Sequence, residues 1–366
     1  MAKESTNTAV ELDLFEMKPA MQSFVFMEKT AQVLNIGFST EKNIVLYGPG
    51  GHGKSEITMA FFAEKGIEPY VITMGTGMTT DRLFGGLDIP TFNSTGKIEY
   101  LVENSFMNHE YVIFEEMFDA PDFILEQLKD ILSSGTFRNG TQVFPIKTKF
   151  IVCCTNRTRD EFSKNMSLKA LMERFPLELN VIWDNYTDIT YNKLLEERFG
   201  EGNVDPIIPF ILQEYAKAGI TISPRVAITA YAVFQEHGPE ALGFIAEFAK
   251  KPSVVANSIK AFEAQAKLRA LGTLMNDHYS LMNLNALSNK AEIVSYTTTL
   301  DEYEDMYKEL KGLKVTDELI DTHTKIVKEH EGRIKQLRKK LSIVTTVEDI
   351  MGEDDAMSES GPQDYK

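Results

Sequence analysis

The stretch LYGPGGHGKSEI, residues 46–57, constrains the fold more than any other part of the sequence. Gly48, Gly53, Lys54 and Ser55 fit the spacing G-x-x-x-x-G-K-[ST], after an apolar strand pattern and before a helical one. Glycines there let successive backbone N–H groups turn inward around an anion, and the helix N-terminus adds partial positive charge. The pattern predicts a phosphate-binding loop made of Gly48, Pro49, Gly50, Gly51, His52, Gly53, Lys54 and Ser55.

Within this loop, two side chains have expected roles. Lys54 can reach the β- and γ-phosphates of a nucleotide, and the Ser55 hydroxyl is placed to ligate Mg²⁺. His52 occupies a position that normally contributes backbone only, so it is expected to bind through its main chain.

Short apolar runs alternate with helical patterns through the first half of the chain. The runs KNIVLYG, PYVITM, EYVIFEEM, TKFIVCCTN and PLELNVI predict five strands, and residues 21–35 predict one amphipathic helix. This alternation indicates an α/β fold with a parallel sheet covered on both faces. From about Tyr186 the strand signal stops, and residues 192–251 predict four helices of a separate small domain.

Composition narrows the class of protein. The formal charge of −16 argues against a general nucleic-acid binder, because phosphate neutralisation supplies most non-specific affinity. Cys153 and Cys154 are adjacent, so they cannot form an ordinary disulfide. We find no signal-peptide pattern and no apolar run long enough to span a membrane, so a cytoplasmic location is expected.

Polar residues at the ends of two later strands suggest hydrolytic chemistry. Glu115 stands where an aspartate usually holds the Mg²⁺ shell, and Glu116 where a glutamate activates the attacking water. Asn156 ends the fourth strand and can orient the water or the γ-phosphate. Arg174 in LMERF and Arg225 in ISPR attract interest because an inserted arginine accelerates phosphoryl transfer by roughly 10³–10⁵.

Taken in order, the loop, acid pair, CCTN, LMERF and ISPR resemble an AAA+ ATPase, and more narrowly its MoxR-like branch, over residues 21–250. The resemblance implies a five-stranded sheet of order 5-1-4-3-2, hairpin inserts in DRLFGGLDIPTFNSTGKIEYL and GTFRNGTQVFPIK, and ATP with Mg²⁺ as ligands. The resemblance also implies that Arg174 is an arginine finger, which reaches the nucleotide of a neighbouring subunit, and that Arg225 contacts nucleotide from the helical lid. Arg157 and Arg159 compete for the finger role.

The expected organisation follows from these motifs and the resemblance. Residues 1–42 form an N-terminal helical segment, 43–184 the nucleotide-binding α/β domain, 185–251 a helical lid, 252–345 a helical extension, and 346–366 an acidic disordered tail. The extension, which matches no family extension, could serve as an oligomerisation coil, a cap on a ring or a partner arm.

A trans-acting arginine implies a homo-oligomer, and the resemblance implies a hexameric ring that remodels or assembles a protein complex, often with a von Willebrand A partner. The acidic charge favours protein over DNA as cargo. Phe92, Phe137 and Phe144 could grip a polypeptide or merely pack, whereas a DNA motor would use Arg138, Lys147 and Lys149. A metal-chelatase-type subunit and a nucleotide-gated scaffold with weak hydrolysis, which Glu115 favours, remain alternatives.

Overall fold

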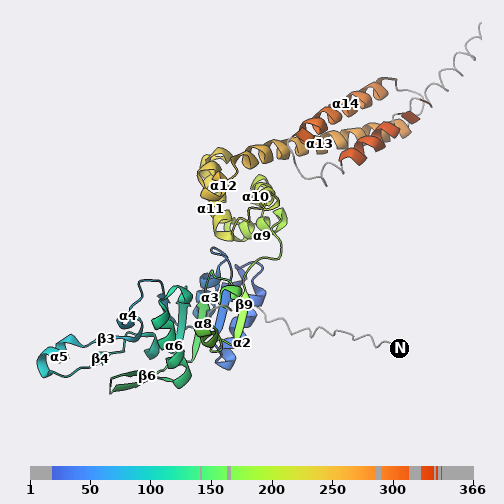
Figure 1. Ribbon diagram of the computed structural model, residues 1–366. Helices are drawn as coiled ribbons and strands as arrows, with labels where there is room; N and C mark the ends of the chain where they lie inside the picture. The colour runs from blue at the N-terminus through green and yellow to red at the C-terminus, as the bar shows by residue number, and fades with distance from the viewer. Residues whose placement is uncertain are drawn as a thin grey trace, which may run out of the picture. The chain divides into compact units, whose positions relative to one another are not determined.

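Five parallel strands form the central sheet in the computed structural model (Figure 1). Its order is β2-β5-β8-β1-β9, which is the predicted 5-1-4-3-2 order read from the other edge. The sequence prediction of the α/β class and of all five strands is confirmed. The strands are β1 Ile44–Tyr47, β2 Tyr70–Thr73, β5 Tyr111–Glu115, β8 Phe150–Cys154 and β9 Leu177–Asn180.

The structure describes residues 19–140, 142–162, 166–284, 290–312, 323–333, 335–336 and 339. The predicted acidic tail, 346–366, and the segment before α1, residues 1–18, lie outside these residues. No helix within the described part of the chain combines the length and apolar character needed to cross a bilayer. Two compact units divide the chain, at residues 1–236 and 237–366. The finer boundaries expected from the sequence stay a prediction.

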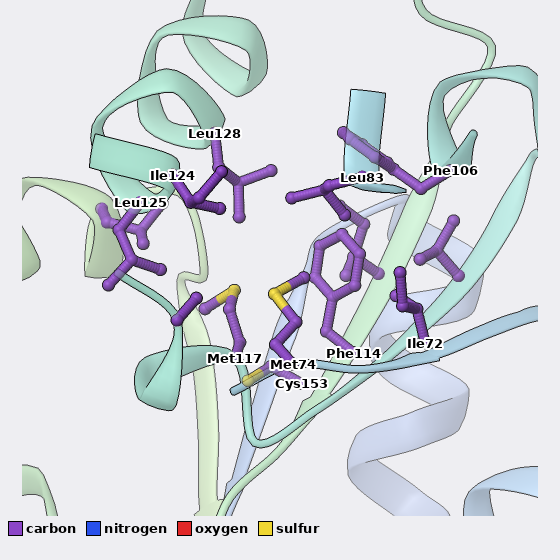
Figure 2. Close-up of a cluster of buried hydrophobic side chains, with 14 of the residues drawn as sticks. Ile72, Met74, Leu83, Phe106, Phe114, Met117, Ile124, Leu125, Leu128 and Cys153 are labelled. Carbon is purple, nitrogen blue, oxygen red and sulfur yellow. The ribbon is translucent and has the colours of Figure 1, made fainter. Parts of the chain in front are cut away.

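Alternate residues of each central strand supply the cores on the two faces of the sheet. Val112 and Phe114 of β5 lie in one cluster, whereas Ile113 between them lies in the other. Helix α6, Asp122–Ser134, covers the first face with Ile124, Leu125 and Leu128 (Figure 2). Helices α2, Glu28–Thr40, and α3, Lys54–Glu64, cover the second. Burial on both faces explains why these strands read as continuous apolar runs.

The helix expected at residues 21–35 is wrong in its extent. The chain instead forms α1, Pro19–Gln22, and α2, separated by a turn in which Phe26 has φ 61°. A left-handed phenylalanine costs roughly 1–2 kcal/mol. In return the Phe26 ring meets Trp183 edge-on at 5.8 Å and lies 4.9 Å from the Lys193 ammonium. The break therefore anchors the N-terminal segment to residues that follow the sheet.

Two inserts project from the sheet domain, as the resemblance implied. The first pairs β3, Gly86–Leu87, with β4, Tyr100–Leu101, around helix α5, Ile89–Thr95; the second is the hairpin of β6, Thr136–Asn139, and β7, Gln142–Pro145. The Gln142 side-chain amide donates to the Ile98 carbonyl, which ties the two inserts together. Helices α4, Thr80–Phe84, α7, Arg159–Phe162, and α8, Met166–Met172, and short 3₁₀ turns η1, Phe106–Asn108, and η2, Met117–Asp119, complete the domain.

Three lid helices follow in the first unit: α9 Asp188–Phe199, α10 Ile207–Lys217 and α11 Pro224–His237. The fourth helix expected from PEALGFIAEFAKK is replaced by a 3₁₀ helix, η3 Pro239–Phe244, and the single-turn helix α12 Ala246–Ala249. Gly238, with φ 76°, and Pro239 separate this segment from α11. The predicted helical character is confirmed, whereas a continuous fourth helix is wrong.

The second unit also contains the long helices α13, Pro252–Leu284, and α14, Lys290–Gly312, which lie side by side, together with helical residues 323–333 (Figure 1). Two tyrosines of α14 bind buried histidines of the last segment. The Tyr296 hydroxyl lies 2.6 Å from His330 Nδ1, and the Tyr303 hydroxyl 2.7 Å from His323 Nδ1. The seven-residue spacing of both pairs places these polar contacts in successive layers of one helical bundle.

Candidate functional site

The loop of residues 48–53 joins β1 to α3 at the carboxyl edge of the sheet. Gly48 has φ 136°, and a Cβ there would come within 2.4 Å of the Val181 carbonyl oxygen. Gly51 has φ 76°, and its Cβ would meet the Ser223 hydroxyl at 2.7 Å. Both positions therefore require glycine, for backbone conformation and for close approach. Pro49 and Gly50 at the tip are exposed.

Lys54 opens α3 and folds back across this loop. Its ammonium donates to the carbonyl oxygens of Gly48, at 2.8 Å, and Pro49, at 3.0 Å. Burial lowers the pKa of Lys54, and the nearby Glu116 carboxylate opposes that shift. The ammonium thus lies against the loop carbonyls next to the α3 N-terminus, where an anion would meet both positive groups.

His52 departs from the backbone-only role expected for it, because its ring is buried and engaged. Nδ1 lies 3.2 Å from the Gly50 carbonyl oxygen, and Nε2 lies 2.8 Å from the Tyr186 hydroxyl. Burial lowers the pKa of His52, and the Lys54 charge lowers it further. No local sequence pattern points to this contact, since Tyr186 lies 134 residues away.

Glu115 and Ser55 both lie next to Cys154, at the carboxyl edge of the sheet. Glu115 is the parallel-register partner of Cys154. Burial raises the pKa of the Cys154 thiol, and the nearby hydroxyls of Thr58 and Ser55 oppose that shift. Thr73, at the end of β2, donates its hydroxyl to Glu115 Oε2 at 2.7 Å. A hydroxyl and a carboxylate are oxygen donors of the kind Mg²⁺ prefers, so these residues fit the ion. Thr73 is a residue that the sequence reasoning missed.

Glu116 and Asn156, which come after two neighbouring strands, are in contact in the structure. Glu116 has φ 51°, and its Oε2 accepts a hydrogen bond from the Asn156 backbone N–H at 3.2 Å. The left-handed backbone turns this side chain away from the strand direction of Glu115. The carboxylate therefore lies against the loop after β8.

Arg225 brings the lid onto the phosphate loop. Its backbone N–H donates to the Gly51 carbonyl oxygen at 3.1 Å, and its guanidinium pairs with Glu56 in the first turn of α3 at 2.5 Å. A cavity of about 480 Å³ adjoins this contact. It is walled by Phe24 and Met27 of the N-terminal turn, Trp183 after β9, and Leu194, Arg225 and Ile228 of the lid.

The remaining arginines point elsewhere in the same chain. Arg174 Nε donates to the Ser133 hydroxyl at 3.0 Å, and its Nη1 donates to the Ala170 carbonyl and lies 3.1 Å from a Glu173 carboxylate oxygen. None of these residues belongs to the phosphate loop. The guanidinium stays partly exposed, at 31% of its side chain.

Arg157 and Arg159 have partners within the chain as well. Arg157 binds Asp119 through Nε at 2.7 Å and Nη2 at 2.6 Å, which joins the segment after Glu116 to the segment after Asn156. Arg159 pairs with Glu178 of β9 at 2.7 Å. The doubly bonded Arg157 is held in place beside its own site.

The hairpin residues singled out from the sequence behave differently from one another. Phe137 is buried and stacks on Phe84 at 5.4 Å and on Phe144 at 6.2 Å, so its role is packing. Phe92 on α5 is 42% exposed. Lys149 is paired with Glu110 at 2.9 Å, whereas Arg138 and Lys147 are exposed.

A family model describing the MoxR domain of MoxR–vWA–beta-propeller ternary systems matches residues 12–202, more than half of the 366 residues. This match extends from before α1 to just beyond α9. It contains the phosphate loop, both acidic residues, Asn156 and Arg174, and stops before Arg225.

Solved structures with related folds are distant. NtrX from Brucella abortus in complex with ADP is 15% identical with a TM-score of 0.40, over 63% of this chain and 50% of that one. NtrX in complex with ATP is 15% identical with a TM-score of 0.42, over 83% and 70%. The RuvB Holliday junction branch migration motor of Thermotoga maritima is 15% identical with a TM-score of 0.37, over 57% and 60%. The chain thus spans half of the ADP-bound NtrX chain.

Proposed function

The chain belongs to the MoxR family of AAA+ ATPases, and on that premise we propose that it binds ATP with Mg²⁺ and hydrolyses it within an oligomer. One observation carries the proposal. The Glu116 carboxylate lies near the Lys54 ammonium of the phosphate loop and accepts a hydrogen bond from the Asn156 backbone N–H, with Oε2 3.2 Å from that nitrogen. A nucleotide-binding loop alone would not need that second pair.

Each residue has one task in this proposal. Lys54 leaves the Gly48 and Pro49 carbonyls to bind the phosphates, and Arg225 leaves Glu56 to meet the nucleotide from the lid. Glu116 accepts the proton of the attacking water, and Asn156 orients that water. The cavity walled by Phe24, Met27 and Trp183 receives the base.

Ser55 and Glu115 would hold Mg²⁺, which neutralises developing phosphate charge when bound. Thr73 restrains the longer Glu115 side chain, because its hydroxyl fixes one carboxylate oxygen. The glutamate at this position therefore has a structural partner, which favours an active ATPase over the weakly hydrolysing scaffold.

Two variants test ATP hydrolysis directly. Lys54→Ala should lose both fluorescent-ATP binding and phosphate release. Glu116→Gln should still bind and should release phosphate about 10²–10⁴-fold more slowly, since a positioned general base contributes that much. If the wild-type chain binds no ATP with Mg²⁺ present, the proposal is wrong. If it binds ATP but scarcely hydrolyses it, the scaffold replaces the proposal. If Glu116→Gln hydrolyses ATP at the wild-type rate, another group is the base.

We further propose a ring, with six subunits as in the resemblance, acting on a protein complex that includes a von Willebrand A partner. Support comes from the matched family, described by its MoxR–vWA–beta-propeller systems, and from the charge of −16. DNA-stimulated hydrolysis that declines with added salt would instead favour the DNA motor.

A further inference from the structure

His52 and Tyr186 connect the phosphate loop to the start of the lid. Tyr186 lies in the linker between β9 and α9, and its hydroxyl reaches His52 Nε2 at 2.8 Å. The two rings also meet edge-on, with centroids 6.1 Å apart. His52 itself is only 4% exposed.

The hydrogen-bond directions of this pair are fixed by chemistry. The Gly50 carbonyl oxygen 3.2 Å from Nδ1 can only accept, so Nδ1 of the imidazole carries the proton. Nε2 of the neutral ring is then an acceptor, and the Tyr186 hydroxyl donates to it. The imidazole therefore bridges a backbone carbonyl of the loop and a side chain of the linker.

From Tyr186 the contacts continue into the lid. Its ring packs on Trp183 at 5.6 Å and on Tyr191 of α9 at 6.2 Å. The buried Tyr191 hydroxyl donates to the Ile222 carbonyl oxygen at 2.7 Å, just before α11. Arg225, at the start of α11, returns to the loop by donating its N–H to the Gly51 carbonyl oxygen. The lid thus meets the loop at both of its ends.

We propose that the His52–Tyr186 contact is a latch that transmits occupation of the phosphate loop to the lid linker. Phosphates entering the loop draw Lys54 away from the Gly48 and Pro49 carbonyls, and the loop backbone that carries His52 adjusts with them. Because His52 holds Tyr186, the linker follows. His52 and Tyr186 are positioning residues, and the inference rests on the proposed nucleotide binding.

The chain supplies its own probe, since Trp183 is its single tryptophan and packs on Tyr186. Trp183 also walls the cavity assigned to the base, so a nucleotide could change its emission directly. Inorganic tripolyphosphate with Mg²⁺ fills the loop without a base and removes that ambiguity. Its binding is measured separately by calorimetry on the full chain.

The wild-type chain should bind tripolyphosphate and change its Trp183 emission. Tyr186→Phe keeps the ring but loses the hydroxyl, so it should still bind tripolyphosphate while most of its Trp183 emission change is lost. Tyr231→Phe is the matched control, because the bonds of its hydroxyl among the described residues are to lid residues Asn203 and Asp205, and it should respond as wild type.

The two proposals fail in different ways. Absence of both tripolyphosphate and ATP binding to the wild-type chain would overturn the nucleotide site and the latch with it. Binding with an undiminished emission change in Tyr186→Phe would overturn the latch alone. An equal loss of response in Tyr231→Phe would also overturn it, because general loosening of the lid would then explain the result.

Discussion

The Thr73 hydroxyl donates to Glu115 Oε2 at 2.7 Å and so joins the ends of β2 and β5. Glu115 has one methylene more than the aspartate usual at this position. The extra length brings its carboxylate within reach of β2, where Thr73 fixes one oxygen.

Thr73→Val should weaken Mg²⁺ binding at the nucleotide site. The valine keeps the shape of threonine but cannot donate, so Glu115 loses its restraint, and the apparent Mg²⁺ affinity should fall about fivefold. The measurement is a Mg²⁺ titration of fluorescent-ADP binding. Thr73→Ser retains the hydroxyl and should behave as wild type.

A double substitution checks the reason for this effect. In a Glu115→Asp background the shorter carboxylate should no longer depend on Thr73, so adding Thr73→Val should change little. If Thr73→Val weakens Mg²⁺ binding equally in both backgrounds, Thr73 does not act through Glu115.

Gly51→Ala should separate the lid from the phosphate loop. A Cβ at Gly51 would lie 2.7 Å from the Ser223 hydroxyl and 3.2 Å from the Arg225 Cβ, at a φ of 76°. We expect a loss of about 2 kcal/mol in the free energy of unfolding, because left-handed backbone strain adds to the steric clash. Chemical denaturation followed by Trp183 emission measures it. Gly50→Ala, where a Cβ meets nothing within 4 Å, should cost less than half as much.

The strands and the phosphate loop of the sheet domain could be predicted because each is specified by residues that are neighbours in the sequence. Each central strand is a short apolar run, and the glycine spacing of residues 48–55 specifies its own loop. Glu116 and Asn156 follow their strands directly, so parallel pairing brings them together at one edge. Their meeting needed no knowledge of the rest of the fold.

Contacts between distant segments could not be predicted in this way. The break at Phe26 depends on Trp183 and Lys193, and the burial of His52 depends on Tyr186. Arg157, which the sequence offers as a competitor for the finger role, is likewise paired with Asp119 from a distant segment. Periodicity and spacing report on one segment at a time, whereas each of these features depends on a contact between two segments that are distant in the sequence.

The helical second unit should lose stability in acid. Burial lowers the pKa of His323, and the nearby charge of Arg269 lowers it further. Burial also lowers the pKa of His330; there Arg333 acts in the same direction and Glu329 opposes it. The unfolded chain, with ordinary histidines near 6.5, then binds protons that the folded unit does not. Stability is therefore full above about pH 6.5 and declines as the pH falls below it.

Urea unfolding of the full chain by far-ultraviolet circular dichroism at pH 7.5 and 5.5 measures this loss. Replacing both histidines by glutamine should reduce the pH dependence of the helical transition. His109→Gln, in the other unit beside Tyr70, is the control and should leave it unchanged. Equal pH dependence in the double variant and the wild type would contradict the assignment.

ATP hydrolysis lost on substituting Arg174 should be recoverable when a second chain supplies an intact Arg174. Hydrolysis lost on substituting Arg157 should not be recoverable in this way. Arg174 has a partly exposed guanidinium and no contact among those described with its own phosphate loop, as a finger for a neighbour requires. Arg157 is bound to Asp119 beside its own Glu116 loop. Alone, Arg174→Ala should reduce hydrolysis by about 10³-fold or more, since that is the contribution of an inserted arginine.

Mixed oligomers separate the two roles. A Glu116→Gln chain has no base but keeps its finger, so mixing it with Arg174→Ala chains should restore part of the hydrolysis in the Arg174→Ala pockets. Mixing it with Arg157→Ala chains should restore none, because that defect lies within the pocket itself. Recovery with Arg157→Ala and not with Arg174→Ala would reverse the assignment, and full hydrolysis by a monomer would remove the need for either arginine in trans.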